Sequence, residues 1–324
     1  MTVSNLAELL DPVGVDEFLA DYYGQRWCYI PGGPRKFDGL FDWADVNRTL
    51  AHHHLDWIHR DRDGALDRPR LGMVKEGQNL RNDVLVGPVE APDGSRRSQI
   101  DQVALTHQVR GGTTLYGGDL GDYHPALGAL ATNVGRVLGE RVKMGMHAVT
   151  RTVSGRKGHS DAFDIFVLQV AGRKRWRLRG RDPLRPIVGQ AVAPNPDPGP
   201  VELDAVLEPG DVLYVPVGWW HDPCAVDGPS LHMNVTILPR TGDHFLAWMR
   251  SAVESLPSFA AAASAAASGE SPDAALMAAL RDDVSAMVTP ESLARFLHEA
   301  AEDARQTERL AFAFPETGTP DDGS

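Results

Sequence analysis

The stretch GHSDAFDIFVLQV, residues 158–170, decides the fold, and AGRKRW follows it at residues 171–176. Two residues that often bind metals, His159 and Asp161, come directly before the apolar run of this stretch. The β-branched and aromatic residues of that run predict a buried strand. Gly172 indicates a tight turn and the basic run after it a second strand, so we expect a hairpin here. Potential metal ligands therefore lie at the entrance of a core strand.

A second stretch, EPGDVLYVPVGWWH at residues 208–221, completes the pattern. Its proline and glycine residues predict turns on either side of a short strand, and the second turn directs His221 inward. Because His159 and Asp161 are two residues apart, a strand-like backbone puts their side chains on one face. Two imidazoles and one carboxylate then form three ligands on one face of a metal ion and leave its other coordination positions open. This arrangement suits Fe(II) in non-haem oxygenases. The competing interpretation is a surface His-x-Asp pair and an unrelated core histidine.

Two further strands indicate which side chains face the interior. Residues 141–150 and residues 230–238 alternate between apolar and polar residues. The apolar positions are Val142, Met144, Met146, Ala148, Leu231, Met233, Val235 and Ile237, and the opposite faces carry Lys143, Gly145, His147, His232, Asn234 and Thr236. One apolar face and one face of polar or small residues suit the wall of a barrel that holds a polar ligand. The sequence therefore predicts a mainly β barrel with helical additions.

The remaining elements of the N-terminal part follow from periodicity and turn residues. We expect a helix at 15–22 that Gly24 ends, a strand at 27–30, a short helix from Asp42, strands at 55–60 and 70–74 joined across Asp63 and Gly64, a helix at 125–138 between Pro125 and Gly139, a proline-rich loop at 179–200, and strands at 201–207 and 212–215. Residues 76–97 are polar and glycine-rich, and we interpret them as a flap or a substrate-side loop.

The composition changes near Thr241, where helical periodicity replaces strand alternation. Helices are expected around Phe245, after Pro272 and from Thr289, with residues 260–269 as a linker or a helix end. We therefore predict three parts: a catalytic domain at 1–240, a helical region at 241–314 and a disordered tail at 315–324.

Charge and composition exclude several classes of protein. The formal net charge of −12 argues against nucleic acid or an anionic membrane as a general partner. Two cysteines give no disulfide framework and fit a reducing compartment, which predicts a cytoplasmic protein. We expect no signal peptide and no membrane span, because the sequence has neither a basic N-terminal region before an apolar run nor an apolar stretch of about 20 residues. Motifs typical of hydrolases, kinases and zinc ribbons are also missing.

In combination, the motifs resemble the JmjC-type members of the cupin superfamily, and within them the ribosomal-oxygenase-like group. The matching residues are His159, Asp161, Asp164, Phe166, Leu168, Gln169, residues 172–176, Pro209, Gly210, Asp211, Tyr214, Pro216 and His221, together with Phe18, Leu19, Ala20 and Tyr22 of the first helix. The resemblance covers roughly residues 12–240. It implies a double-stranded β-helix that binds Fe(II) and 2-oxoglutarate and uses O2 to hydroxylate a C–H bond.

The resemblance also implies roles for single residues. His159, Asp161 and His221 are the expected iron ligands and form the catalytic centre. The expected contacts of 2-oxoglutarate are Lys174, Thr236, His147 and Asn234. A buried carboxylate of the cosubstrate needs a hydrogen-bonded countercharge, and Lys174 occupies the position of the family's basic residue.

The alternative for Lys174 is a surface charge. Arg173 or Arg175 would then anchor the cosubstrate, although strand alternation puts both on the opposite face.

Two departures from the family bear on the substrate. The family usually has a tyrosine where this chain has His147, which changes a hydrogen-bonding partner of the cosubstrate or substrate. The loop at 150–158 is basic instead of proline-rich, which favours an acidic substrate segment if it frames the active-site mouth, and is otherwise a solvated loop. The C-terminal helices are candidates for homodimerisation, as in the family. The chain after them is too short for the winged-helix domain of ribosomal oxygenases, which weakens the case for a ribosomal-protein substrate.

Other candidates have simpler explanations. His52, His53 and His54 point in different directions along a chain and are interpreted as a surface cluster. Cys224 is expected in the core, and Trp176, Trp219 and Trp220 are expected to pack. The predicted function is a 2-oxoglutarate-dependent hydroxylase of a side chain in a peptide or protein. The alternatives are the same chemistry on a free amino acid or natural-product intermediate, and a metal-binding cupin that oxidises nothing.

Overall fold

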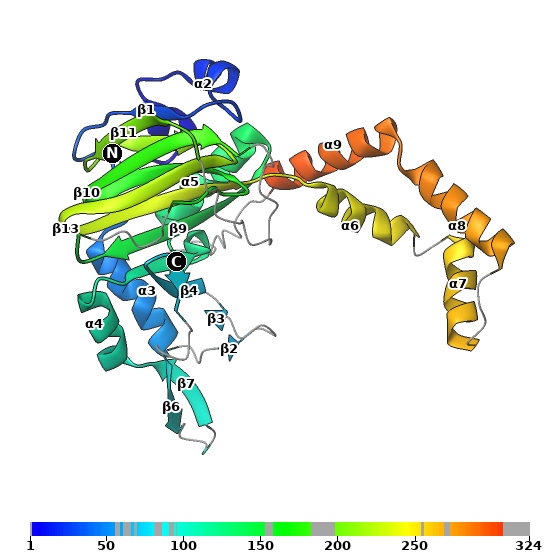
Figure 1. Cartoon of the computed structure of the whole chain (residues 1–324), viewed down its shortest axis with the longest axis horizontal. Coiled ribbons are helices and arrows are strands. Elements are labelled where there is room, and N and C mark those ends of the chain that lie inside the picture. Colours follow the sequence, from blue (N-terminus) through cyan, green and yellow to red (C-terminus); the bar gives the residue numbers. More distant parts are fainter. Residues whose placement is uncertain are drawn as a thin grey trace, which may run out of the picture. The chain divides into compact units, whose positions relative to one another are not determined.

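The computed structural model describes the chain except residues 1, 56–58, 61–65, 68–69, 81–85, 91–93, 95, 153–157, 183–197, 254–255, 269–272 and 307–324. The chain divides into two compact units, Met1–Gly242 and Asp243–Ser324 (Figure 1). The first unit contains the β-sheet and the second contains helices only among its described residues. The predicted mainly β class with helical additions is confirmed.

Two long strands, β10 (Asp164–Arg181) and β13 (Trp219–Leu238), form the centre of the main sheet and pair antiparallel along most of their length. The sheet order is β1 (Cys28–Ile30), β12 (Val212–Val215), β10, β13, β9 (Arg141–Val149), β8 (Thr114–Gly118), β4 (Arg70–Lys75) and β5 (Gln78–Asn79). A further strand, β11 (Val201–Leu207), pairs with the second half of β10. The long strand β10 thus pairs with β12 along its first half and with β11 along its second half, which agrees with the jelly-roll architecture.

The predicted hairpin at Gly172 is wrong, because the chain continues through it as one strand. The pairing of β10 with β13 shifts register around residues 169–173, and Gly172 has a φ of 65°. This is a β-bulge, which bends a strand without ending it. The predicted last strand at 230–238 is likewise the second half of β13, which already begins at Trp219.

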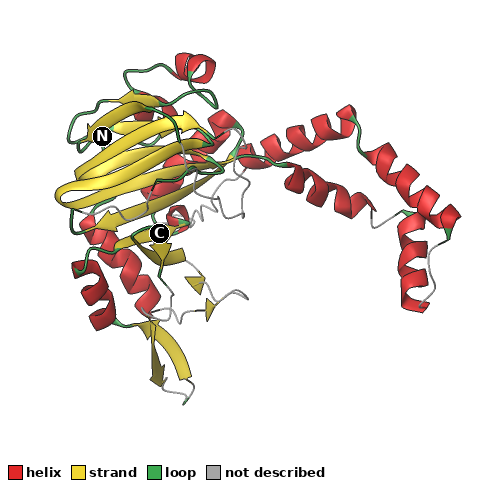
Figure 2. Ribbon diagram, viewed as in Figure 1, coloured by secondary structure: helices red, strands yellow, loops and turns green. Residues whose placement is uncertain are grey.

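Helices cover the N-terminal part of this unit. Their bounds are α1 (Leu6–Leu10), α2 (Val15–Asp21), α3 (Trp43–Leu55), α4 (Gln102–Arg110), the 3₁₀ turn η2 (Leu120–Asp122) and α5 (Pro125–Leu138). The expected signals hold for α5, which begins at Pro125 and ends before Gly139 in the left-handed conformation. Figure 2 shows the helices around the strands of this unit.

The predicted strand at 55–60 is only partly right. Leu55 ends α3, and the strand β2 is limited to His59–Arg60, paired with β3 (Leu66–Asp67). The predicted turn at Asp63 and Gly64 lies outside the described residues. Much of the predicted flap at 76–97 is ordered as strands: β5 occupies Gln78–Asn79, and β6 (Val86–Glu90) forms a hairpin with β7 (Arg96–Ile100).

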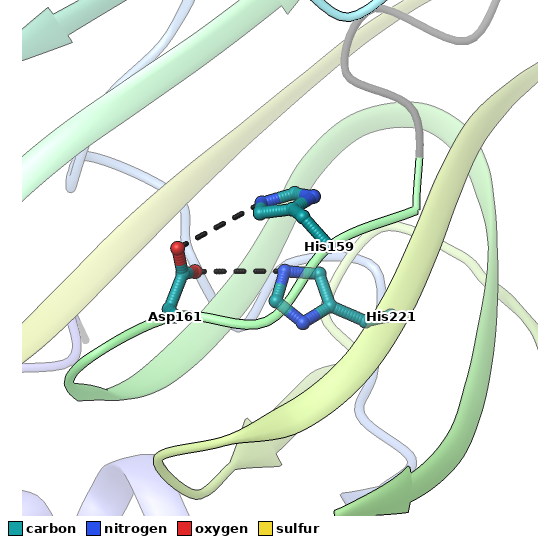
Figure 3. A group of neighbouring side chains, drawn as sticks. All are labelled: His159, Asp161 and His221. Carbon is teal, nitrogen blue, oxygen red and sulfur yellow. Dashed lines mark ion pairs between the residues drawn. The ribbon is translucent and has the colours of Figure 1, made fainter. Parts of the chain in front are cut away.

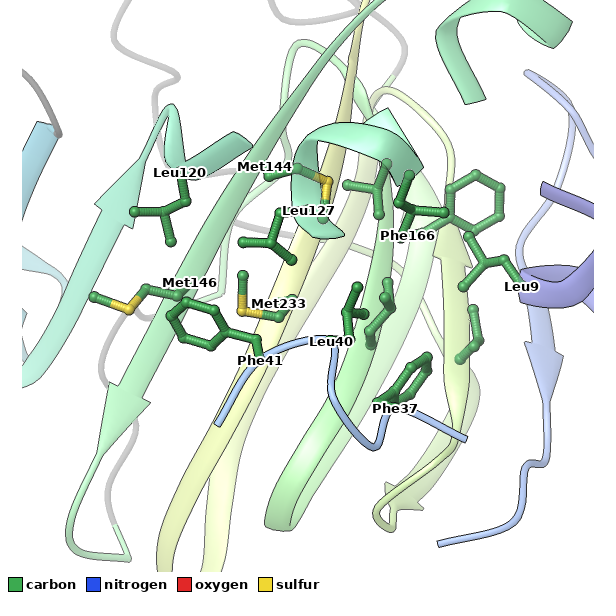
Figure 4. Close-up of a cluster of buried hydrophobic side chains, with 14 of the residues drawn as sticks. Leu9, Phe37, Leu40, Phe41, Leu120, Leu127, Met144, Met146, Phe166 and Met233 are labelled. Carbon is green, nitrogen blue, oxygen red and sulfur yellow. The ribbon is translucent and has the colours of Figure 1, made fainter. Parts of the chain in front are cut away.

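The first part of the central strand β10, residues 164–169, is buried on both faces, which explains its nearly continuous apolar run. Phe166 and Leu168 belong to the larger hydrophobic cluster, whereas Ile165 and Val167 belong to a second cluster. Figure 4 shows the larger cluster. Side chains from the N-terminal segments, α5, β9, β10 and β13 meet there: Leu9, Phe37, Leu40, Phe41, Leu120, Leu127, Met144, Met146, Phe166 and Met233. The opposite faces of β9 and β13 are therefore free to line a pocket.

The second unit consists of α6 (Gly242–Val253), α7 (Pro257–Ser268), α8 (Ala274–Met287) and α9 (Pro290–Gln306). The alanine-rich stretch left open as linker or helix end lies mostly in α7. Helices α6 and α9 contact each other through rings of Phe245, Trp248 and Phe296, and the Trp248 indole donates to Glu299 over 2.7 Å. Among the described helices, none has the length and apolar character needed to cross a bilayer.

Candidate metal centre

Three side chains converge at one end of the β10–β13 pair. The carboxylate of Asp161 lies 3.7 Å from Nε2 of His159 and 3.5 Å from Nε2 of His221 (Figure 3). The three potential ligand atoms lie within 4.8 Å of one another. Two ligand atoms bound at right angles to one first-row metal ion, each about 2.1 Å from it, are about 3 Å apart. The two separations between the carboxylate and the imidazoles, 3.7 and 3.5 Å, are close to this value.

The backbone explains why these residues meet. His159 and His221 form an isolated antiparallel β-bridge, in which each backbone N–H donates to the other residue's carbonyl, over 3.0 and 2.8 Å. Asp161 lies in the connection between this bridge and β10. The pair His159 and Asp161 is thus not part of one continuous strand, and the bridge to β13 brings the triad together.

The imidazole of His221 is held in one orientation. Its Nδ1 lies 2.9 Å from the backbone carbonyl of Trp219, an acceptor, so Nδ1 carries the proton. The lone pair of Nε2 then faces Asp161, as metal binding requires. The ring is buried and lies 5.7 Å from the ring of Trp176. One carboxylate and two imidazoles in an open cluster fit a divalent first-row metal better than Ca²⁺, which prefers oxygen ligands alone.

A pocket of about 460 Å³ extends from the triad between β8, β9, β10 and β13. All four predicted cosubstrate residues line it: His147, Lys174, Asn234 and Thr236. Five residues for which no site role was predicted line it as well: His232, Tyr116, Asp119, Lys143 and Phe163. Strand alternation did indicate that His232 faces the pocket, because it places His232 on the same polar face as Asn234 and Thr236.

Lys174 is the buried cation of this pocket. Its side chain is 5% exposed, and its Nζ lies 3.3 Å from Nδ1 of His232. Burial lowers the pKa of Lys174 to about 8, and the nearby Cys224 opposes this shift weakly. Within the described part of the chain, Lys174 forms no ion pair with a carboxylate. Arg173 and Arg175 lie on the other face, where they pair with Asp227 and Asp204.

Two imidazoles stack beside the Lys174 ammonium. The rings of His147 and His232 are 4.9 Å apart and nearly parallel, at 4°. Burial, with smaller contributions from Lys174 and His147, holds the pKa of His232 well below its ordinary value. His232 is therefore neutral, and it accepts a hydrogen bond from Lys174. Asn234 lies next in the row, with Nδ2 3.5 Å from Nδ1 of His147.

Several buried polar atoms of the pocket lack a hydrogen-bond partner among the described residues. They are Oγ1 of Thr114, Nε1 of Trp176 and Oδ1 of Asn234. An unsatisfied buried polar atom costs free energy, so such atoms mark places where a ligand can bind. At the same pocket, Lys143 and Asp119 form an ion pair of 2.8 Å. Trp176 thus faces the pocket in addition to packing.

Among the residues that the structure describes, the other candidates form no second metal cluster. The side chains of His52, His53 and His54 lie outside the described set. Cys224 is half-buried rather than a core residue, and its thiol lies 3.5 Å from the Ala225 carbonyl. Trp219 is buried in the second cluster, and Trp220 is covered by the guanidinium of Arg179.

The sequence of this region matches a known family. The family model of the JmjC domain matches residues 132–244. This part of the chain is thus similar to JmjC domains. The matched residues contain the whole triad, Lys174 and all of β9, β10 and β13.

Curated proteins share parts of this sequence. Bifunctional lysine-specific demethylase and histidyl-hydroxylase NO66 of Drosophila willistoni is 25% identical over 240 residues, which is 72% of this chain and 28% of that protein. Ribosomal oxygenase 1 of Rattus norvegicus is 42% identical over 87 residues, 25% of this chain and 14% of that protein. Ribosomal protein uL16 3-hydroxylase of Escherichia coli is 35% identical over 69 residues, 21% of this chain and 18% of that protein. The chain thus spans less than a third of the length of these relatives.

Solved structures share the fold of this chain. The E. coli ribosomal oxygenase YcfD in complex with cobalt and 2-oxoglutarate superposes with a TM-score of 0.52 at 18% identity, covering 94% of this chain and 75% of that one. Another structure of E. coli YcfD gives a TM-score of 0.54 at 17% identity, covering 94% and 76%. Similarity at this identity establishes the architecture.

Proposed function

We propose that the JmjC domain binds Fe(II) and 2-oxoglutarate and uses O2 to hydroxylate a side chain of a peptide or protein. The observation that carries the proposal is the combination of an open His-Asp-His triad with a buried Lys174 in one pocket. The triad offers three ligands on one side of an ion. The lysine offers a positive charge that lacks a carboxylate partner among the described residues.

The buried lysine favours an anionic ligand. A charge taken out of water without a partner is costly, and Lys174 has only the neutral His232 beside its ammonium. A ligand carboxylate at this place would supply the missing charge and accept hydrogen bonds. A dicarboxylate such as 2-oxoglutarate would offer one carboxylate to Lys174 and its keto acid to a metal held by the triad, since both line the same pocket.

Bound Fe(II) and 2-oxoglutarate together supply the oxidising power, with O2 as oxidant and CO2 and succinate as products. The chain holds and orients these groups. His159, Asp161 and His221 would hold the metal, while Lys174 and Thr236 would fix the distal carboxylate. The apolar side chains of Phe163, Ile165 and Trp176 line the pocket and keep water from the reacting groups.

A protein substrate is supported by the names of the relatives, which describe a ribosomal protein hydroxylase, a histidyl-hydroxylase and a lysine demethylase. Among these reactions we propose hydroxylation of a side chain, because both names describe a hydroxylase. Recognition of an acidic segment rests on the basic loop at 150–158, of which residues 153–157 lie outside the described structure. The runner-up is a small-molecule substrate bound within the same pocket.

Two further proposals concern the whole protein. The helices of the second unit expose large apolar side chains, Leu246, Met277, Val284, Val288, Leu293 and Leu297, which supports homodimerisation through this unit.

Both cysteines are free, which supports a reducing compartment such as the cytoplasm.

The decisive experiment is an anaerobic titration of the metal-free protein with Fe(II) and 2-oxoglutarate. Chelation of the keto acid by iron gives a weak visible charge-transfer band. We expect the band in the wild type, its loss in His159→Ala, and a much higher 2-oxoglutarate requirement in Lys174→Ala. Lys143→Ala, which removes an exposed lysine of the pocket rim, is the matched control. Metal binding without any band would instead support a cupin that oxidises nothing.

A further inference from the structure

The connection between β12 and β13 is a four-residue turn from Pro216 to Trp219. The backbone N–H of Trp219 donates to the carbonyl of Pro216 over 3.2 Å, and Gly218 has a φ of 82°. A positive φ at the third position is characteristic of a type II turn. The turn matters for the site because the metal-ligand candidate His221 comes two residues after it.

Asp164, the first residue of β10, holds this turn. Its side chain is buried, Oδ1 accepts the N–H of Val217 over 2.7 Å, and Oδ2 accepts the hydroxyl of Tyr214 over 2.6 Å. The Tyr214 hydroxyl accepts in turn from the backbone N–H of Gly24, over 2.8 Å. One carboxylate offers an oxygen to each of two donors, so Asp164 fixes both the end of β12 and the turn after it.

The same turn touches the triad on its other side. The N–H of Gly218 donates to the carbonyl of Asp161 over 2.9 Å. Gly218 and His221 are three residues apart on one chain, and His221 is bridged to His159 by two backbone hydrogen bonds. The position of the turn therefore determines where the Asp161 backbone lies relative to the two imidazoles.

We propose that Asp164 is a positioning residue of the metal centre. Through the Val217 N–H it holds the turn, and through the Gly218 N–H the turn holds Asp161 at the correct distance from His221. Asp164 acts through the backbone and does not itself ligate the ion. The proposal rests on the metal-binding part of the proposed function and is independent of the cosubstrate and the reaction.

The test measures Co(II) binding by the full-length chain, in the absence of 2-oxoglutarate. Asp164→Ala removes both acceptors, and we expect Co(II) affinity to fall about 10–100-fold, the effect typical of residues that orient metal ligands. The visible Co(II) spectrum should change as well, because the ligand geometry changes. Asp164→Asn keeps an oxygen for the Val217 N–H and should restore both the affinity and the spectrum.

A second variant tests the same link without changing the carboxylate. Val217 occupies the second position of a type II turn, where proline is favoured, so Val217→Pro removes the donor N–H and keeps the turn. We expect weaker Co(II) binding and an altered spectrum, even if Asp164→Ala does not fold. Tyr214→Phe is the stability control, since it removes the bonds of the hydroxyl to Oδ2 of Asp164 and to Gly24 but keeps the bond between Oδ1 and the Val217 N–H: its melting temperature should fall while its Co(II) spectrum stays that of the wild type.

The possible results distinguish an error in the proposed metal centre from an error in the role of Asp164. If the wild type binds no Co(II), the proposed metal centre itself is wrong. If the wild type binds Co(II), and both Asp164→Ala and Val217→Pro bind it with unchanged affinity and spectrum, Asp164 has only a structural role and our inference is overturned.

Discussion

The ammonium of Lys174 lies 3.3 Å from Nδ1 of His232, and both side chains are buried. Two groups that can each carry a positive charge share one small volume, and burial favours the neutral form of both. The pKa of His232 lies well below its ordinary value, and that of Lys174 is lowered to about 8. The pocket is thus close to losing its positive charge when no anion is bound.

The affinity for 2-oxoglutarate should decrease at alkaline pH. Binding of a carboxylate requires the protonated form of Lys174, which the ligand-free protein loses as the pH rises through about 8. We expect a nearly constant dissociation constant below that pH and an increase of up to about tenfold per pH unit above it. Anaerobic titrations between neutral and alkaline pH measure this. Lys174→Arg, which stays charged, should show no such increase, and a constant affinity of the wild type would contradict the prediction.

The same group should make the ligand-free protein more stable as the pH rises. The folded-state pKa of about 8 lies below the ordinary lysine value of 10.5. Between these two pH values the unfolded chain keeps the proton and the folded chain has lost it, so the free energy of unfolding increases with pH. The increase is at most about 1.4 kcal/mol per pH unit. Urea unfolding of Lys174→Met should lack it, whereas the control Lys143→Met should retain it.

Substitution of Gly158 should disturb the metal centre through Trp220. A Cβ at Gly158 would lie 1.8 Å from the Trp220 ring, so either the indole or the backbone before His159 must move. We expect Gly158→Ala to weaken Co(II) binding about tenfold, as loss of ligand orientation does. Adding Trp220→Ala should restore much of the affinity. If the double variant binds no better than Gly158→Ala, the clash is not the cause.

Substitution of Gly172 should destabilise the protein at the bulge of β10. Its φ is 65°, and an added Cβ would lie 1.9 Å from the Pro229 carbonyl. Strain of this kind costs about 1–3 kcal/mol, and the backbone clash adds to it. Gly24→Ala is the matched control, because Gly24 has nearly the same φ, 67°, and open space at the Cβ position. Chemical denaturation should show a clearly larger loss for Gly172→Ala than for Gly24→Ala.

Local patterns predicted the strands that carry the site. Alternation in β9 and β13 placed Val142 and Met233 on the apolar face and His147 and Asn234 opposite, and the structure has this arrangement. The helix at 125–138 was recognisable because Pro125 and Gly139 mark both ends. Such features depend on residues close in sequence, which a linear pattern contains.

Features that depend on distant partners were predicted less well. Gly172 was interpreted as a turn because glycine with a positive φ occurs in turns and in bulges alike, and only the pairing with β13 decides between them. The β6–β7 hairpin has few apolar residues, so no periodicity indicated its strands. His232 was placed on the correct face, but its closeness to Lys174 arises from the pairing of β10 with β13.

The bridge between His159 and His221 has a consequence for folding kinetics. The two residues lie far apart along the chain, and so do the paired halves of β10 and β13. The chain loses conformational entropy when such long loops close, before the new contacts stabilise it. Non-local β pairing is therefore slow. We therefore expect the ligand set to be assembled late in folding. A metal ion held by this set would stabilise the folded state and slow its unfolding, while leaving the rate of folding almost unchanged.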